Sequence, residues 1–364
     1  MSAADKPILE VRDLAVSFAT DEGVVQAVDG VSFDLRAGEI LAVVGESGCG
    51  KSVTAMTLLG LTRSPNARFD GTATYKGTEL LSATDEELQR IRGAEIAMIF
   101  QDPMASLNPV MKIGDQIVEQ ILAHNEITKV QGRDRAIELL DRVGIPRARE
   151  RADSYPHEFS GGMRQRVMIA LALSCDPSVL IADEPTTALD VTVQAQILRR
   201  FRELRDETNA ALILVTHDLG VVADLADQVA VMYAGRIVEQ GTLDDVFYDP
   251  QHPYTWGLLG AIARIDRPRR SRLPTIPGLP PSLANRPQGC HMRPRCPHEH
   301  DACLKVPPLE SREGAAAGHR DRCWLEPDRK RQLREIAPGE IGLRPKAPPV
   351  TPSAKPPTKP KRAA

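Results

Sequence analysis

The chain has 364 residues and a formal net charge of −3, so no global basic field favours nucleic acid and we expect no nucleic-acid partner. No run approaches the ~18 apolar residues of a membrane-spanning helix, and the first six residues lack the apolar core of a signal peptide. These observations predict a cytoplasmic chain, long enough for two domains or for one large domain with an appendage.

The first part of the chain predicts strands around a glycine-rich loop. Runs at 8–11, 14–18 and 31–35 are strand-like, and residues 40–44 are apolar and β-branched enough for a buried strand. Residues 45–52 then fit G-x-x-x-x-G-K-[ST] at every fixed position, and residues 53–61 predict a helix. A strand, a glycine loop and a helix in this order wrap a polyphosphate in backbone N–H groups.

We therefore predict that this loop binds ATP, against the alternative of a glycine-rich turn that binds nothing. Lys51 supplies a charge to the β- and γ-phosphates, and Ser52 offers its hydroxyl to Mg²⁺. Cys49 lies near a helix N-terminus, which lowers the pKa of a thiol, so we expect its alkylation to block ATP binding. The predicted loop residues are Gly45, Glu46, Ser47, Gly48, Cys49, Gly50, Lys51 and Ser52.

Later segments alternate between strand and helix patterns. We expect strands within 71–80 and at 96–100, 179–182 and 211–216, and helices within 113–143, 163–175 and 191–209. This alternation predicts a mostly parallel α/β sheet, with a helical block at 103–155 set on it.

Two carboxylates end the apolar strand at 179–182. Because ligands bind at strand tips in α/β sheets, Asp183 is placed to hold Mg²⁺. Glu184, one residue further, is placed to polarise a water aligned with the γ-phosphate. The alternative is a strand whose polar end simply meets solvent.

Ser160, Gly161 and Gly162 open a helix and form a second anion site from backbone N–H groups and the helix dipole. One chain with one phosphate loop has no local use for a second γ-phosphate clamp, so we expect this clamp to close on nucleotide held by another subunit. His217 follows the strand at 211–216, where a γ-phosphate contact is favoured over a purely structural role.

Together these motifs resemble the ATP-binding subunits of ABC transporters, over roughly residues 8–265. The resemblance implies a P-loop NTPase α/β cassette with a mostly parallel core sheet, antiparallel N-terminal strands and a helical subdomain at about 103–175. It also implies a head-to-tail dimer with two ATP molecules between the subunits. The signature reads Phe159-Ser160-Gly161-Gly162-Met163 where the family usually has Leu-Ser-Gly-Gly-Gln, but the anion-binding residues remain.

The resemblance assigns roles to further residues. It implies that Glu184, His217 and Gln101 are catalytic, and that Ser52, Gln101 and Asp183 hold Mg²⁺. Phe18 falls where the family stacks an aromatic on adenine, with core packing as the alternative. Asp190 closes the segment Thr187–Asp190, which matches the family's D-loop.

Three stretches, at 100–109, 155–162 and 252–255, look like the oligopeptide/dipeptide/nickel branch of ABC importers. The chain is most similar to the first ATPase subunit of a peptide importer, with nickel as the alternative cargo. The branch implies a second ATPase subunit (the same chain or, as we favour, a homologous one), two transmembrane permease subunits and an extracytoplasmic substrate-binding protein. It places the chain peripherally on the cytoplasmic face of the membrane.

Composition changes after residue 265, where Pro and Arg become frequent. We expect domains at 1–265 and 266–343, followed by a disordered, basic, Pro-rich tail at 344–364. Cys290, Cys296, Cys303 and Cys323 lack the paired C-x2-C spacing of a zinc ribbon. They predict a [4Fe–4S] cluster, as in some members of this branch, with Zn²⁺ or free thiols as alternatives.

Three rival functions fit the sequence less well. A soluble ABC ATPase that acts on DNA or ribosomes usually has tandem cassettes or a long heptad insertion, and neither is present. An exporter half would carry its own membrane helices. A nucleic-acid-binding metal module would interleave aromatic residues with the cysteines, where only Trp324 occurs.

Overall fold

The computed structural model describes residues 6–102, 106–186, 190–261, 275–311, 316 and 318–336. The predicted tail at 344–364 lies outside the described residues, as do residues 187–189 of the D-loop segment and 103–105 of the stretch at 100–109.

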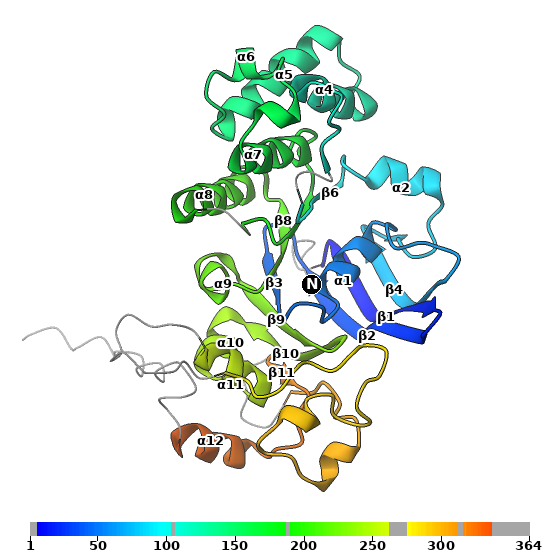
Figure 1. Ribbon diagram of the computed structural model, residues 1–364, viewed down its shortest axis with the longest axis vertical. Coiled ribbons are helices and arrows are strands. Elements are labelled where there is room, and N and C mark those ends of the chain that lie inside the picture. Colours follow the sequence, from blue (N-terminus) through cyan, green and yellow to red (C-terminus); the bar gives the residue numbers. More distant parts are fainter. Residues whose placement is uncertain are drawn as a thin grey trace, which may run out of the picture.

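Two sheets form the framework of the protein (Figure 1). The smaller is antiparallel, in the order β2-β1-β4-β5, and contains β1 (Leu9–Thr20), β2 (Gly23–Leu35), β4 (Ala67–Tyr75) and β5 (Thr78–Glu79). The larger has the order β11-β10-β9-β3-β8-β7-β6. Its strands are β3 (Ile40–Val44), β6 (Ile96–Ile99), β7 (Val179–Asp183), β8 (Ala211–Thr216), β9 (Gln228–Tyr233), β10 (Arg236–Thr242) and β11 (Arg320–Asp321).

Helices lie around the sheets and at one end of the molecule, where α4, α5 and α6 gather above α7 (Figure 1). The α-helices are α1 (Lys51–Leu58), α2 (Asp85–Ile91), α4 (Ile113–His124), α5 (Lys129–Arg142), α6 (Ala148–Arg151), α7 (Gly161–Ala172), α8 (Val191–Thr208), α9 (Leu219–Leu225), α10 (Leu243–Tyr248), α11 (Pro253–Gly260) and α12 (Pro327–Ile336). Short 3-10 turns are η2 (Pro156–Glu158), η3 (Arg293–Arg295) and η4 (Asp301–Leu304).

Burial explains why the central strands have apolar sequences. Every residue of β3, β7 and β8 is buried, as expected for parallel strands covered on both faces. Strand β8 has the predicted bounds, and the mostly parallel core with antiparallel N-terminal strands is confirmed. The helices α4, α5 and α7 share a separate apolar core that includes Ile117, Leu140 and Phe159.

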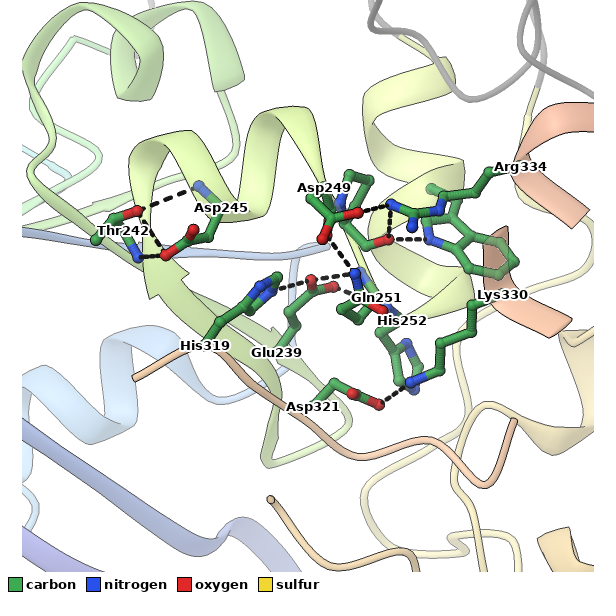
Figure 2. A network of polar contacts seen from close by, with 12 residues as sticks. Glu239, Thr242, Asp245, Asp249, Gln251, His252, His319, Asp321, Lys330 and Arg334 are labelled. Carbon is green, nitrogen blue, oxygen red and sulfur yellow. Dashed lines mark hydrogen bonds and ion pairs between the residues drawn. The ribbon is translucent and has the colours of Figure 1, made fainter. Parts of the chain in front are cut away.

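The C-terminal region contributes an edge strand to the larger sheet. Strand β11 pairs antiparallel with β10, which places Asp321 opposite Glu239. The fully buried Glu239 carboxylate accepts the backbone N–H groups of Gln251 (2.6 Å) and His252 (2.9 Å), and it contacts Nε2 of His319 at 2.8 Å (Figure 2). Burial lowers the pKa of His319 and the two interactions with Glu239 raise it, with a net increase.

A second buried ion pair lies beside this network. Lys330 Nζ of α12 contacts Asp321 Oδ2 at 2.7 Å, and the two side chains are 0% and 2% exposed (Figure 2). Breaking one partner of such a pair leaves an uncompensated buried charge. The pair therefore holds α12 against β11, the strand that joins the C-terminal region to the larger sheet.

We expect Asp321→Asn to destabilise the protein by about 3 kcal/mol, because Lys330 would remain buried without a counter-charge. The matched control is Asp328→Asn, which removes the exposed partner of Arg331 on the same helix and should change stability by about 0.5 kcal/mol or less. Denaturant midpoints of both variants measure this difference. Equal midpoints for the two variants would contradict the expectation.

Candidate active site

Four neighbouring parallel strands of the larger sheet end at the same edge. Val44 at the end of β3 lies beside Thr216 at the end of β8, and β7 and β6 follow in the same direction. Because carboxyl ends of parallel strands meet at one edge, residues that are distant in sequence become neighbours. The residues within two positions of these ends include Gly45, His217, Glu184 and Gln101.

The loop at 45–52 wraps around its own lysine. Lys51 is 5% exposed, and its Nζ donates to the carbonyls of Gly45 (2.8 Å) and Glu46 (3.0 Å). Gly50 precedes α1 with φ of +105°, and a Cβ there would lie 2.3 Å from the Ala27 carbonyl oxygen. Only glycine fits this position, because it needs both left-handed backbone and close approach to a neighbouring strand.

Asp183 and Ser52 meet at the start of α1. Ser52 Oγ donates to Asp183 Oδ1 at 3.0 Å, across 131 residues of sequence. Burial raises the pKa of Asp183, and the neighbouring Glu184 raises it further, against the lowering by Ser52 and Lys51. A hydroxyl and a carboxylate are oxygen donors that Mg²⁺ prefers, so these residues fit the predicted metal.

Glu184 is held between Gln101 and His217. Gln101 Nε2 donates to Glu184 Oε2 at 3.0 Å, and His217 Nδ1 lies 3.1 Å from Glu184 Oε1. The Glu184 side chain is 12% exposed and its φ is +46°, a left-handed conformation uncommon for a residue other than glycine. The structure thus brings together the three residues that the sequence predicts as catalytic.

The predicted second anion site lies at the start of α7. Ser160 is exposed, and its Oγ accepts the N–H of Met163 at 3.4 Å as the N-cap of the helix. Among the described residues, no hydrogen bond joins Ser160 to the 45–52 loop. Gln165 of the same helix is buried, and its amide donates to the Pro185 carbonyl at 2.7 Å, next to Glu184.

Two other predicted residues have local partners. Asp190 is the N-cap of α8, where its carboxylate accepts the N–H groups of Thr192 and Val193. Phe18 lies on β1, partly buried against an apolar cluster formed by residues of both sheets and of α1. That contact fits core packing, and the stacking role of Phe18 stays a prediction.

The expected reactivity of Cys49 is not supported. Cys49 is 5% exposed, and burial raises the pKa of its thiol although Lys51 lowers it. Desolvation thus outweighs the helix N-terminus in this position. The sequence predicts a lowered pKa for Cys49, and this prediction is wrong because the sequence does not show how completely the thiol is buried.

We now expect Cys49 to resist alkylation at neutral pH, with or without Mg-ATP. Reaction with iodoacetamide followed by peptide mass spectrometry measures the modified fraction at each cysteine. Cys175, which is only partly buried, serves as the internal comparison and should react faster. Rapid labelling of Cys49 that Mg-ATP suppresses would restore the original expectation.

The expected metal site at the four late cysteines is not supported either. All four are described, yet the described part of the chain holds no group of three or more His, Cys, Asp or Glu that could hold a metal ion. Burial raises the pKa of Cys296 to about 11 and that of Cys323 to about 12. Cys290 and Cys296 pack against the apolar cluster that contains Met292, and as placed the four thiols form no group that could hold a [4Fe–4S] cluster or Zn²⁺.

Two residues near the loop were not assigned a role from the sequence. Tyr254 of α11 accepts the backbone N–H of Glu46 at 2.8 Å, and Arg295 contacts the Glu46 carboxylate through both of its terminal nitrogens. Tyr254 belongs to the stretch at 252–255, which is typical of the importer branch. Tyr254 could have been predicted as a site residue from that motif, but no local sequence pattern indicates a role for Arg295.

Comparisons with known proteins agree with this geometry. The family model described as "ABC transporter" matches residues 28–187, and the one described as "Oligopeptide/dipeptide transporter, C-terminal region" matches residues 238–303. The oligopeptide transport ATP-binding protein OppD of Salmonella typhimurium is 55% identical over 304 residues, covering 84% of this chain and 90% of that protein. The chain belongs to the ABC transporter family.

Further relatives extend this assignment. The dipeptide transport ATP-binding protein DppD of Bacillus subtilis is 51% identical, covering 88% of this chain and 96% of that protein. The solved structure of the ATP-binding cassette MJ0796, a dimer bound to ADP and Pi, has a TM-score of 0.59 at 24% identity and covers 65% of this chain and 98% of that one. This likeness confirms the ABC cassette fold.

Family membership makes the chain an ABC-type ATPase, as predicted from the sequence. None of the helices in the described ranges is both long and apolar enough to cross a membrane.

Proposed function

We propose that this chain is the ATP-hydrolysing subunit of an ABC importer of dipeptides and oligopeptides. The observation that carries the proposal is 55% identity over 90% of the length of an oligopeptide transport ATP-binding protein. The match to the C-terminal family model at 238–303 supports the same branch.

For the chemistry, we assign ATP to the loop at 45–52, with Lys51 contacting the β- and γ-phosphates. Ser52, Asp183 and Gln101 would hold Mg²⁺, which supplies positive charge to the phosphate oxygens when bound. Glu184 takes a proton from water as the water oxygen bonds to the γ-phosphorus, and the bond from that phosphorus to the bridging oxygen of ADP breaks. Gln101 and His217 orient the Glu184 carboxylate.

We assign Ser160, Gly161 and Gly162 to the nucleotide of a second, homologous ATPase subunit in a head-to-tail dimer. The exposed position of Ser160 supports this assignment, since its Oγ is used only to cap its own helix among the described residues. The segments 1–265, including the helical subdomain at about 103–175, and 266–343 are proposed as the cassette and its extension. Asp190 and Phe18 are further proposed nucleotide contacts.

The proposed transporter contains this chain, its partner ATPase, two transmembrane permeases and an extracytoplasmic substrate-binding protein. The chain would lie on the cytoplasmic face of the membrane, held there by the permeases. The corresponding subunits of the relatives are named for oligopeptide and dipeptide transport, which supports this arrangement.

Uptake in cells that express the complete transporter tests the proposal. Labelled di- and tripeptides should accumulate with the native chain and fail to accumulate with Glu184→Gln, while nickel uptake should be the same in both. Nickel uptake that depends on Glu184 would instead assign the nickel branch. ATP hydrolysis with neither uptake would favour a soluble ABC ATPase.

A further inference from the structure

Glu46, the second residue of the phosphate loop, is held by two segments that lie far from it in the sequence. Its backbone N–H donates to the Tyr254 hydroxyl, which belongs to a fully buried side chain on α11. Its carboxylate receives a two-pronged contact from Arg295, with Nη1 to Oε2 at 2.7 Å and Nη2 to Oε1 at 2.9 Å. The matched C-terminal region thus contacts the proposed nucleotide site directly.

Arg295 occupies a site that uses its whole guanidinium group. Besides Glu46, its nitrogens donate to the Pro277 carbonyl (2.8 Å), the Ile276 carbonyl (3.4 Å) and the Tyr233 hydroxyl (3.3 Å). These contacts give all five N–H donors an acceptor. The side chain is 4% exposed and lies 5.7 Å from the centroid of the Tyr233 ring. A planar guanidinium group whose donors are all engaged cannot rotate, so it fixes its partner carboxylate in one orientation.

This contact matters for the charge at the loop. Lys51, the residue assigned to the phosphates, is itself held by the carbonyls of Gly45 and Glu46. A Glu46 carboxylate without Arg295 would place an unpaired negative charge beside the polyphosphate of ATP. It would also be free to compete for the Lys51 ammonium.

We propose that Arg295 is a positioning residue of the phosphate loop: by neutralising and orienting Glu46, together with Tyr254, it makes the C-terminal region a determinant of ATP affinity. This inference rests on the proposed function, in which the loop binds ATP. Because coupling between two sites is reciprocal, bound ATP also stabilises the segment around Arg295 on the cassette.

The test is a titration of the full-length protein with a fluorescent ATP analogue and Mg²⁺. We expect Arg295→Ala to weaken binding on the order of tenfold, within the roughly 5–150-fold range of site-to-site couplings. Adding Glu46→Gln to that variant should recover most of the loss, because the unpaired carboxylate is then gone. Arg295→Lys, which keeps the charge but loses the fork, should lie between the native protein and Arg295→Ala.

The matched control is Arg286→Ala. Arg286 also joins the C-terminal region to the cassette, but through Asp29 on β2 rather than through the loop. We expect its affinity for the analogue to equal that of the native chain, even if its melting temperature falls as much as that of Arg295→Ala. A lowered melting temperature with unchanged affinity in Arg295→Ala would reduce Arg295 to a structural role and overturn the proposal, as would equal weakening by both variants.

A second readout uses the native chain alone. Hydrogen exchange at residues 290–296 should slow when Mg-ATP is added, and the slowing should vanish in Arg295→Ala and be smaller than native in Arg295→Lys. Unchanged exchange in the native chain would count against the coupling. If instead the native chain does not bind the analogue, or if Lys51→Ala binds it equally well, the proposed function fails rather than the role of Arg295.

Discussion

Replacement of Glu184 by glutamine should lower the rate of ATP hydrolysis by about 10²- to 10⁴-fold, because the amide cannot take the proton of the attacking water. ATP binding should stay close to native, since the amide keeps the size of the side chain and its contacts with Gln101 and His217. Steady-state phosphate release and nucleotide titration measure the two quantities separately.

The control for this variant is Glu203→Gln on α8, where the partly buried carboxylate pairs with Arg199 and Arg200 away from the 45–52 loop. Hydrolysis by the control should match the native rate. If Glu184→Gln still hydrolyses ATP at a native rate, Glu184 is not the base, and the strained position of its backbone needs another explanation.

Replacement of Lys51 by alanine should weaken ATP binding by about 10- to 100-fold, because hydrogen bonds to charged groups contribute about 1.5–3 kcal/mol each. Part of this loss comes from the loop itself, because Lys51 Nζ donates to two of its carbonyls and the loop is held less firmly without them. Titration with the analogue measures the change, and a thermal melt separates it from unfolding.

Lys76→Ala is the matched lysine control, because Lys76 is half exposed and pairs with Glu95 away from the phosphate loop. It should bind the analogue as the native chain does. Equal binding by Lys51→Ala and the native chain would remove the 45–52 loop from the nucleotide site.

The sequence predicts well that the candidate site residues meet at one edge of the sheet, because each part of the pattern is local. An apolar run followed by a fixed motif marks a strand and its tip, and parallel pairing alone then collects Lys51, Asp183, Glu184 and His217 at one edge. The cassette fold follows from the same alternation of strands and helices.

The C-terminal region is predicted poorly because its contacts are distant in sequence. The pairs Arg295–Glu46 and His319–Glu239 span 249 and 80 residues, and no spacing rule reports such partners. The prediction of a low pKa for Cys49 is wrong for a related reason, because the motif shows the helix N-terminus but not the residues that bury the thiol. Strand β11 is only two residues long and has no apolar pattern.

The pairing of β11 with β10 affects how such chains can be recombined. One family model ends at residue 187 and the other begins at residue 238, which is the pattern of two exchangeable modules. Yet β11 lies beyond both matches and joins the larger sheet through β10, where the second match begins, and Arg295 needs a carboxylate at position 46. A chimera with a foreign C-terminal region would therefore expose an unpaired strand edge, unless both sides of these contacts are transplanted together.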